Sequence, residues 1–311
     1  MKKLSILLSA LVIFSACEKI IEPKDLPDQD PRLVLNAIVE NDSVFTAYLS
    51  SSKSIISGKE YKSIDKSYCA VYEDGKFLEQ LTFSSKGKYT GTKKPVAGKF
   101  YEFVARASGF TDVNAKSDLP VLPELVSALA YDTVLTVFSA SGPKGKPFES
   151  VFGGMKFKIS LKERSGVADY FELRPILVLV DSFGMPLDIL PPLLAQGGTD
   201  DGSGSSFYTS TGVGGSDADG VVAGLKTFDT YLFCNASISD PDAAGIEIYM
   251  IASRLSEAYY KYLQTSYQQA NTSGSFFAEP TFVYSNCSNG MGIVGGKSSK
   301  LYFIKSVLFK R

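Results

Sequence analysis

Hydrophobic and polar residues alternate along much of the chain from Leu33 onward, which is the pattern of half-buried β-strands. The runs are short and are separated by turn-prone residues, as at Glu73-Asp74-Gly75 and Ala97-Gly98-Lys99. Between residues 32 and 120 they read LVLNAIVE, VFTAYLS, YCAVYEDG, KFLEQLTFSS, KYTGT, KFYEFVARASGF and VNAKSDL. Strands spaced about ten residues apart predict an antiparallel sandwich.

Residues 95–120 carry the clearest fold signal of this first region. They read PVAGKFYEFVARASGFTDVNAKSDLP, an extended edge after a glycine turn followed by a Gly-aromatic corner. This arrangement is similar to that of immunoglobulin-like and carboxypeptidase-regulatory-like modules. We therefore expect a β-sandwich domain at 32–120.

A second β domain is predicted at 121–311. The segment Leu119-Pro-Val-Leu-Pro123 interrupts the alternation and predicts a junction between domains. Beyond it the strand-like runs resume as TVLTVFSA, GGMKFKISLKE, DYFELRPILVLV, TYLFCNASI, GIEIYMIAS, TFVYSN and KLYFIKSVLFK. We expect the whole protein to be mostly β, with a larger antiparallel domain after the first sandwich.

One segment in the second domain has helical instead of strand spacing. Its apolar stripe consists of Leu255, Tyr259, Tyr262, Leu263, Tyr267 and Ala270. Ser256 can cap the N-terminus, and Glu257 with Lys261 forms a favourable i,i+4 pair. The pattern predicts one amphipathic helix over 256–270, whose tyrosines we interpret as core packing and not as a ligand site.

Residues 197–224 predict a surface loop, because nine of these 28 positions are glycine. Both functional loops and neutral insertions have this composition.

The N-terminus has the pattern of a lipoprotein signal peptide over 1–16. Lys2 and Lys3 are followed by an apolar run from Leu4 to Phe14, which is too short to span a bilayer as a helix. Small residues then precede Cys17, which predicts lipidation of Cys17 and anchoring by its acyl chains. An ordinary secretory signal with a chance cysteine is the alternative. Residues 17–31 hold the lipidated cysteine and a tether rich in proline and acidic residues.

Composition excludes several classes of activity. The chain has 311 residues, with 32 Lys and Arg against 33 Asp and Glu, so it lacks the basic excess of a nucleic-acid binder. It has no histidine, which removes Ser-His-Asp catalysis and His-ligated metal sites, and no tryptophan. We expect no cofactor, no bound metal and no catalytic residues, and hence no enzyme.

Three cysteines remain after Cys17, namely Cys69, Cys234 and Cys287. An odd number leaves at least one thiol unpaired unless the protein dimerises covalently. Cys234 with Cys287 is the predicted disulfide, because both lie in the second half of the chain. Free buried cysteines remain equally compatible with the sequence.

Clusters of carboxylates and Ser-x-x-Lys motifs are the other candidates, for calcium binding and for nucleophilic catalysis respectively. Asp200-Asp201, Asp217-Ala-Asp219 and Asp240-Pro-Asp242 could hold calcium, but the bidentate glutamate of an EF-hand is absent, so solvated turns are the default. Ser50-Ser-Ser-Lys53 and Ser63-Ile-Asp-Lys66 lie in a strand-and-turn context, whereas penicillin-binding proteins carry that motif on a helix.

The C-terminal region contains three motifs in succession. They are Leu-Ser-x-x-Tyr-Tyr-x-Tyr-Leu from Leu255, Phe-x-Glu-Pro ending at Pro280, and Ser-Asn-x-x-x-Gly-x-Gly-Ile-x-Gly-Gly ending at Gly296. This succession resembles a family of Bacteroidota lipoproteins of unknown function. The matching residues are Tyr259, Tyr260, Tyr262, Leu263, Phe277, Glu279, Pro280, Asn286, Gly290, Gly292, Gly295 and Gly296. Genes of this family commonly lie beside TonB-dependent receptors, so the resemblance implies an outer-membrane lipoprotein that assists such a receptor.

Two further expectations depend on this compartment. The acidic tether resembles a surface-export signal, which predicts exposure at the cell surface; a lipoprotein facing the periplasm is the alternative. Ser43 and Thr133 each follow an aspartate and precede a hydrophobic residue, which makes them candidate O-glycosylation sites.

Two functions therefore remain. The first is a non-catalytic accessory partner of a TonB-dependent receptor in nutrient uptake, bound through an exposed patch rich in Tyr and Phe. The second is a stand-alone surface module that binds a glycan or a peptide, with tyrosine in place of the missing tryptophan.

Overall fold

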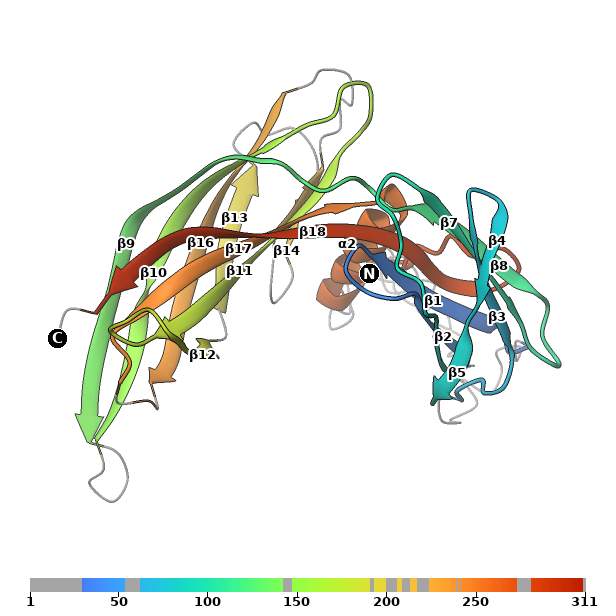
Figure 1. The fold of residues 1–311 in the computed structure, drawn as a ribbon, viewed down its shortest axis with the longest axis horizontal. Helices are drawn as coiled ribbons and strands as arrows, with labels where there is room; N and C mark the ends of the chain where they lie inside the picture. The colour runs from blue at the N-terminus through green and yellow to red at the C-terminus, as the bar shows by residue number, and fades with distance from the viewer. Residues whose placement is uncertain are drawn as a thin grey trace, which may run out of the picture.

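The protein is a mostly β structure of two lobes joined along one long strand (Figure 1). The computed structural model describes residues 30–53, 62–141, 147–190, 193–199, 206–208, 213–216, 224–238, 240, 242–272 and 281–309. The predicted signal peptide, the tether up to Gln29 and Cys17 lie outside these residues. The prediction of a mostly β, sandwich-type protein is confirmed.

The first lobe is a sandwich of two sheets. Its strands are β1 (Leu33–Glu40), β2 (Thr46–Ser51), β3 (Tyr68–Glu73), β4 (Lys76–Gln80), β5 (Thr82–Ser85), β6 (Lys88–Thr90), β7 (Phe100–Arg106) and β8 (Val113–Asp118). One layer has the order β5-β6-β2-β1 and the other β4-β3-β7-β8. Alternate residues of both layers, such as Leu35, Tyr89 and Phe103, are buried in a common core.

The second lobe is a larger sandwich. Its strands are β9 (Leu125–Ser141), β10 (Pro147–Lys162), β11 (Tyr170–Val180), β12 (Pro186–Leu190), β13 (Leu193–Thr199), β14 (Ser206–Tyr208), β15 (Val213–Ser216), β16 (Leu225–Ile238) and β17 (Gly245–Leu255). One layer has the order β13-β16-β10-β9 and faces the layer that contains β11 and β17. Phe157, Phe228 and Ile248 are fully buried between the two layers.

The last strand, β18 (Met291–Leu308), belongs to both lobes. Its first part, up to Lys297, pairs in parallel with β1, and its second part, from Lys297, pairs antiparallel with β17. It therefore merges one layer of each lobe into a ten-stranded sheet (Figure 1). The sequence analysis assigns this strand to the second domain and expects antiparallel pairing, so the parallel contact with β1 is a difference that the structure reveals.

The single described helix, α2 (Glu257–Thr272), lies beneath β18 between the two lobes (Figure 1). It matches the helix predicted over 256–270.

The glycine-rich stretch differs from the predicted loop. Residues 197–199 are the end of strand β13, which pairs with β16. Residues 206–208 and 213–216 form strands β14 and β15, and β15 pairs with β11. The expectation of an unstructured loop was wrong there, because glycine backbone groups can join a ladder without packing a side chain. The remaining residues between 200 and 223 lie outside the described parts of the chain.

Candidate functional site

The two lobes meet where the linker between β8 and β9, residues 119–124, crosses β18. The Ser298 hydroxyl donates a hydrogen bond to the Pro120 carbonyl, and the Tyr302 hydroxyl donates one to the Pro123 carbonyl at 2.7 Å. Gly296 lies so close to the linker that a Cβ atom there would be 1.9 Å from the Asp118 carbonyl oxygen. Only glycine at position 296 allows this approach of the two backbones.

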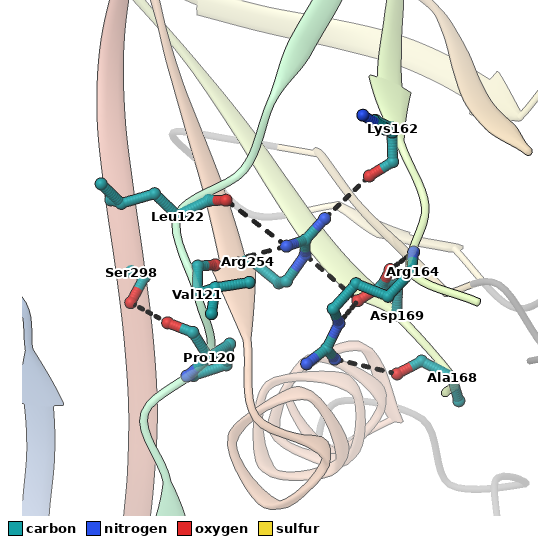
Figure 2. A network of polar contacts seen from close by, with 9 residues as sticks. All are labelled: Pro120, Val121, Leu122, Lys162, Arg164, Ala168, Asp169, Arg254 and Ser298. Carbon is teal, nitrogen blue, oxygen red and sulfur yellow. Dashed lines mark hydrogen bonds and ion pairs between the residues drawn. The ribbon is translucent and has the colours of Figure 1, made fainter. Parts of the chain in front are cut away.

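Arg254, from β17, holds the linker to the second lobe (Figure 2). Its side chain is 4% exposed. Nη2 donates to the Lys162 carbonyl at 2.7 Å, and Nη1 lies 3.4 Å from both the Val121 and the Leu122 carbonyls. Burial lowers the pKa of Arg254 and the carboxylate of Asp169 raises it; arginine nevertheless stays charged in proteins. The guanidinium therefore bonds to two backbone segments at the junction, the linker and the end of β10.

Asp169 is the buried counter-ion of this network (Figure 2). Its Oδ1 accepts a hydrogen bond from Arg164 Nε at 2.7 Å and its Oδ2 accepts one from the Arg164 backbone N–H at 2.7 Å. Arg254 Nε lies 3.1 Å from Oδ1, which is an ion-pair contact without hydrogen-bond geometry. Two guanidinium groups share one carboxylate, so the cluster has a net charge of about +1. Arg164 is partly exposed, so this positive charge reaches solvent.

A second buried ion pair lies where β18 changes partners. Lys297 Nζ donates to Glu172 Oε2 of β11 at 2.5 Å, and the two side chains are 10% and 9% exposed. Removing either partner would leave an uncompensated buried charge.

The motif around Ser256 joins the helix to β18. Ser256 Oγ accepts hydrogen bonds from the Tyr259 N–H at 3.2 Å, as an N-cap, and from the Gly296 N–H at 2.9 Å. A Cβ at Gly295 would lie 2.6 Å from the Tyr259 Cβ, so the tyrosine packs directly on the glycine backbone. Burial raises the pKa of Tyr259 well above its ordinary value.

The other tyrosines of the motif pack around the helix. The ring centres of Tyr260 and Tyr170 lie 4.9 Å apart. Those of Tyr259 and Tyr262 lie 6.5 Å apart, and these two rings are stacked. Leu263 packs against the same small cluster. These contacts agree with the interpretation of the tyrosine stripe as packing.

Asn286, in the segment before β18, forms hydrogen bonds to both β18 and β8. Its side-chain amide donates to the Val294 carbonyl at 2.8 Å and accepts from the Val294 N–H at 3.0 Å. The same amide donates to the Lys116 carbonyl of β8 at 3.1 Å. Gly290 and Gly292 allow close backbone contacts, because Cβ atoms there would lie 2.5 and 2.1 Å from the carbonyl oxygens of Leu33 and Leu35. The motif residues thus build the junction, whereas Phe277, Glu279 and Pro280 lie outside the described residues.

A cleft of about 460 Å³ opens at the surface of this junction. Its lining includes Phe100, Asp118, Val121, Arg164, Val167 and Glu257. Phe100, Val121 and Val167 are 59%, 41% and 47% exposed. Burial raises the pKa of Asp118, while the nearby Arg164 lowers it and Glu257 raises it. The cleft therefore combines an apolar surface with charged groups of both signs.

The predicted disulfide is not formed. Cys287 carries a free thiol, which donates a weak hydrogen bond to the Leu35 carbonyl at 3.5 Å. Cys287 packs against the core of the first lobe, whereas the backbone of Cys234 pairs with Gly153 in the second lobe. The side chain of Cys234 lies outside the described side chains.

The remaining candidates lie apart from the cleft. Ser43 is exposed in the turn after β1, and Thr133 is half-buried in β9. Asp240 Oδ1 accepts a hydrogen bond from the Asp242 N–H at 2.9 Å, which is an ordinary turn contact. Asp200, Asp201, Asp217 and Asp219 lie outside the described residues.

Sequence analysis missed the charged groups of the junction. A signal for Arg254 was present, because Ile246, Ile248, Met250 and Ala252 alternate with polar or half-buried positions and are all buried. The next position in that alternation is Arg254, which the pattern thus assigns to the core face. No comparable signal identifies Asp169, which precedes β11 in an irregular segment.

Fold and junction together define a class of protein, a two-lobed β-sandwich whose lobes share their last strand. The chain belongs to the family described as a domain of unknown function, DUF4249, whose profile matches residues 21–301. The comparison with curated proteins finds no match. In the described part of the chain, no helix is long and apolar enough to cross a membrane, and no three metal-binding side chains gather.

Solved structures with some likeness include a pilin subunit and two collagen-binding proteins. The major pilin subunit BcpA of Bacillus cereus is 8% identical, with 90% of this chain and 69% of that chain covered and a TM-score of 0.19. The collagen-binding domain of RspB from Erysipelothrix rhusiopathiae is 8% identical, with 88% and 97% covered and a TM-score of 0.18. The collagen adhesin CNA of S. aureus is 8% identical, with 88% and 94% covered and a TM-score of 0.15. Likeness at this level carries no functional argument.

Proposed function

We propose that this chain is an outer-membrane lipoprotein, anchored through Cys17 at the cell surface, that acts as a non-catalytic partner of a TonB-dependent receptor in nutrient uptake. The signal-peptide pattern and the tether support the location. The absence of histidine from the sequence supports a binding role over a catalytic one.

The junction cleft is the observation that carries the binding role. Phe100 presents a large apolar surface to solvent, and Asp118, Arg164 and Glu257 surround it with charge. An exposed aromatic side chain within a charged rim is the arrangement of a protein-binding hot spot. Because the Arg254 network holds both walls of the cleft, a partner would meet a preformed surface with little ordering cost.

The test is affinity purification of the tagged full chain from mildly solubilised outer membranes, followed by mass spectrometry. We expect one TonB-dependent receptor in near-equal amount. Phe100→Ser should lose the receptor, whereas Phe183→Ser, at a 90% exposed position in the turn between β11 and β12, should retain it. Recovery of the protein alone would contradict the proposal, and equal recovery with both variants would contradict the role of the cleft.

The alternative function, a surface module for a glycan or peptide, is favoured by one other feature. On the β3–β4 hairpin the ring centres of Tyr72 and Phe77 lie 5.7 Å apart, and Phe77 is 59% exposed. Exposed aromatic rings can stack on sugars. Calorimetry against a panel of glycans and peptides tests this alternative, and flat titrations throughout would eliminate it.

A further inference from the structure

The strand registers define one end of the first lobe, at which the tether enters. β1 begins there at Leu33, opposite Ser51, where β2 ends. In the other layer Tyr68, the first residue of β3, pairs with Arg106, the last residue of β7. Phe110, in the loop after β7, lines clefts with segments of both layers, so the two layers end together. This end, here called the tip, comprises the described residues 30–33, 51–53, 62–68, 85–88 and 106–112.

Positive charge is concentrated at the tip. It holds seven basic residues against three acidic ones, whereas the opposite end of the lobe, residues 40–46, 73–76 and 91–100, holds four of each. The chain as a whole has a formal net charge of −1, so the excess is local. Two of the three acidic groups are engaged, because Asp112 pairs with Arg106 at 2.8 Å and Asp65 Oδ1 accepts the Gly87 N–H at 2.8 Å.

Most of the cations at the tip are free to meet a ligand. Five basic side chains are exposed and form no ion pair with a described residue: Arg32, Lys53, Lys62, Lys66 and Lys86. A cleft of about 550 Å³ opens among them, lined by Lys62, Lys66, Arg106, Ser63, Ser67 and Ser108. Ammonium, guanidinium and hydroxyl groups all donate hydrogen bonds to phosphate oxygens. The cleft therefore fits a phosphate-bearing head group.

The position of the tether places the tip close to the membrane. Asp30 is the first described residue and lies in the tip, and residues 18–29 alone separate it from Cys17. An extended chain spans at most about 3.3–3.6 Å per residue, so this segment holds the tip within about 45 Å of an acylated Cys17. No other described part of the chain is tethered as closely.

Charge argues against two other occupants of the tip. A second copy would bring two surfaces of the same sign together, which is unfavourable. The tether itself carries four acidic and two basic residues over 18–29, so it cannot neutralise the excess of positive charge at the tip.

We propose that the tip binds phosphate groups of the anionic membrane in which Cys17 is anchored, and thereby sets the first lobe against the bilayer. The proposal rests on the lipid anchor of the proposed function. An acyl anchor combined with a polybasic patch attaches a protein more firmly than either does alone. β18 begins beside the tip, where Met291 pairs with Val34, and leads into the second lobe, so this contact directs the second lobe away from the bilayer (Figure 1).

Lysine footprinting of the acylated protein purified from membranes tests the proposal. The protein is reconstituted into vesicles of phosphatidylcholine alone or of equal parts phosphatidylcholine and phosphatidylglycerol, acetylated briefly, and digested for mass spectrometry. We expect Lys53, Lys62, Lys66 and Lys86 to react about threefold more slowly, or less, on the anionic vesicles. Lys76, at the opposite end of the lobe, should react equally on both. High salt should remove the difference, because it screens exposed charges.

Two double variants with the same change of charge locate the contact. Lys62→Glu with Lys66→Glu should abolish the difference at Lys53 and Lys86, whereas Lys76→Glu with Lys94→Glu, at the opposite end, should keep it. Equal labelling on the two kinds of vesicle, or loss of the difference with both variants, would overturn the proposal.

Three further outcomes identify other causes. Equal protection on neutral vesicles would overturn the proposal in favour of the tether as the occupant. Equal protection by inorganic phosphate without vesicles would overturn it in favour of a soluble ligand. An intact mass without acyl chains would contradict the anchor alone, because anionic vesicles added to that form should still slow the reaction of the four lysines.

Discussion

Ser256 bonds to two segments at once, and it is one of several polar residues of this kind at the junction. Its hydroxyl caps helix α2 and also accepts the Gly296 N–H of β18. Asn286 similarly bonds to Val294 and to Lys116 of β8. Because each such side chain satisfies backbone groups on separate elements, its loss affects the helix or strand and the junction together.

Replacement of Ser256 by alanine should lower the free energy of unfolding by about 1–2 kcal/mol, because an N-cap and a second backbone hydrogen bond are lost. Urea unfolding followed by circular dichroism measures this difference. Ser266→Ala in the same helix is the control, since its side chain makes no hydrogen bond to a described residue, and it should change the stability little. Equal effects of the two variants would show that the cap contributes nothing.

The thiols of Cys69 and Cys287 should resist alkylation in the folded protein. Burial raises the pKa of each to about 12, so little of the reactive thiolate is present at pH 8. In denaturant without reductant both should be labelled at once, which mass spectrometry of tryptic peptides detects. Labelling of Cys287 that requires prior reduction would instead demonstrate a disulfide.

Asp118 should make stability depend on pH. Burial raises its pKa in the folded state above the ordinary value of 3.8. The folded state therefore binds the proton more tightly than the unfolded state, and ionisation at neutral pH destabilises the fold. Asp118→Asn should be more stable than the natural chain at pH 7, and the gain should disappear as pH falls toward 3.8. Asp42→Asn, in an exposed turn, serves as control; a gain independent of pH would contradict this cause.

At the scale of elements, local patterns predicted most of the strands and the helix, but the run TFVYSN at 281–286, expected as a strand, is irregular. The alternation at 33–40 became β1, the turn at Asp74-Gly75 joins β3 to β4, and Ser256 begins the helix as expected. Partners distant in sequence were less predictable. The Gly-rich segment before β18 indicates close backbone contact, but only the fold reveals that Leu33 and Leu35 are the residues approached. Ion pairs such as Lys297–Glu172 join positions 125 residues apart and leave no local periodicity.

The contact of β18 with the linker should be intolerant of a methyl group at position 296. Gly296→Ala would place its Cβ 1.9 Å from the Asp118 carbonyl, which is backbone and cannot rotate away. We expect a loss of more than about 3 kcal/mol in the free energy of unfolding. Gly75→Ala is the matched control: nothing lies within 4 Å of its Cβ, so only its left-handed backbone costs about 1 kcal/mol. Similar losses for the two variants would refute the close approach.

At the scale of the whole molecule, β18 makes the two sandwiches interdependent. A division near residue 120 follows the linker but separates β1 from its partner strand, since Met291–Lys297 come from the other end of the chain. The Arg254 network and the junction cleft also depend on both sides of this linker. The central claim is therefore that the lobes fold as one unit around the shared strand.

Scanning calorimetry of the full chain tests this claim most directly, with Arg254→Ala as the perturbation. We predict one transition whose calorimetric and van't Hoff enthalpies agree, shifted as a whole by the variant, which leaves the buried Asp169 short of a partner at a cost of about 3–5 kcal/mol. Two separate transitions, of which Arg254→Ala moves only one, would contradict the claim.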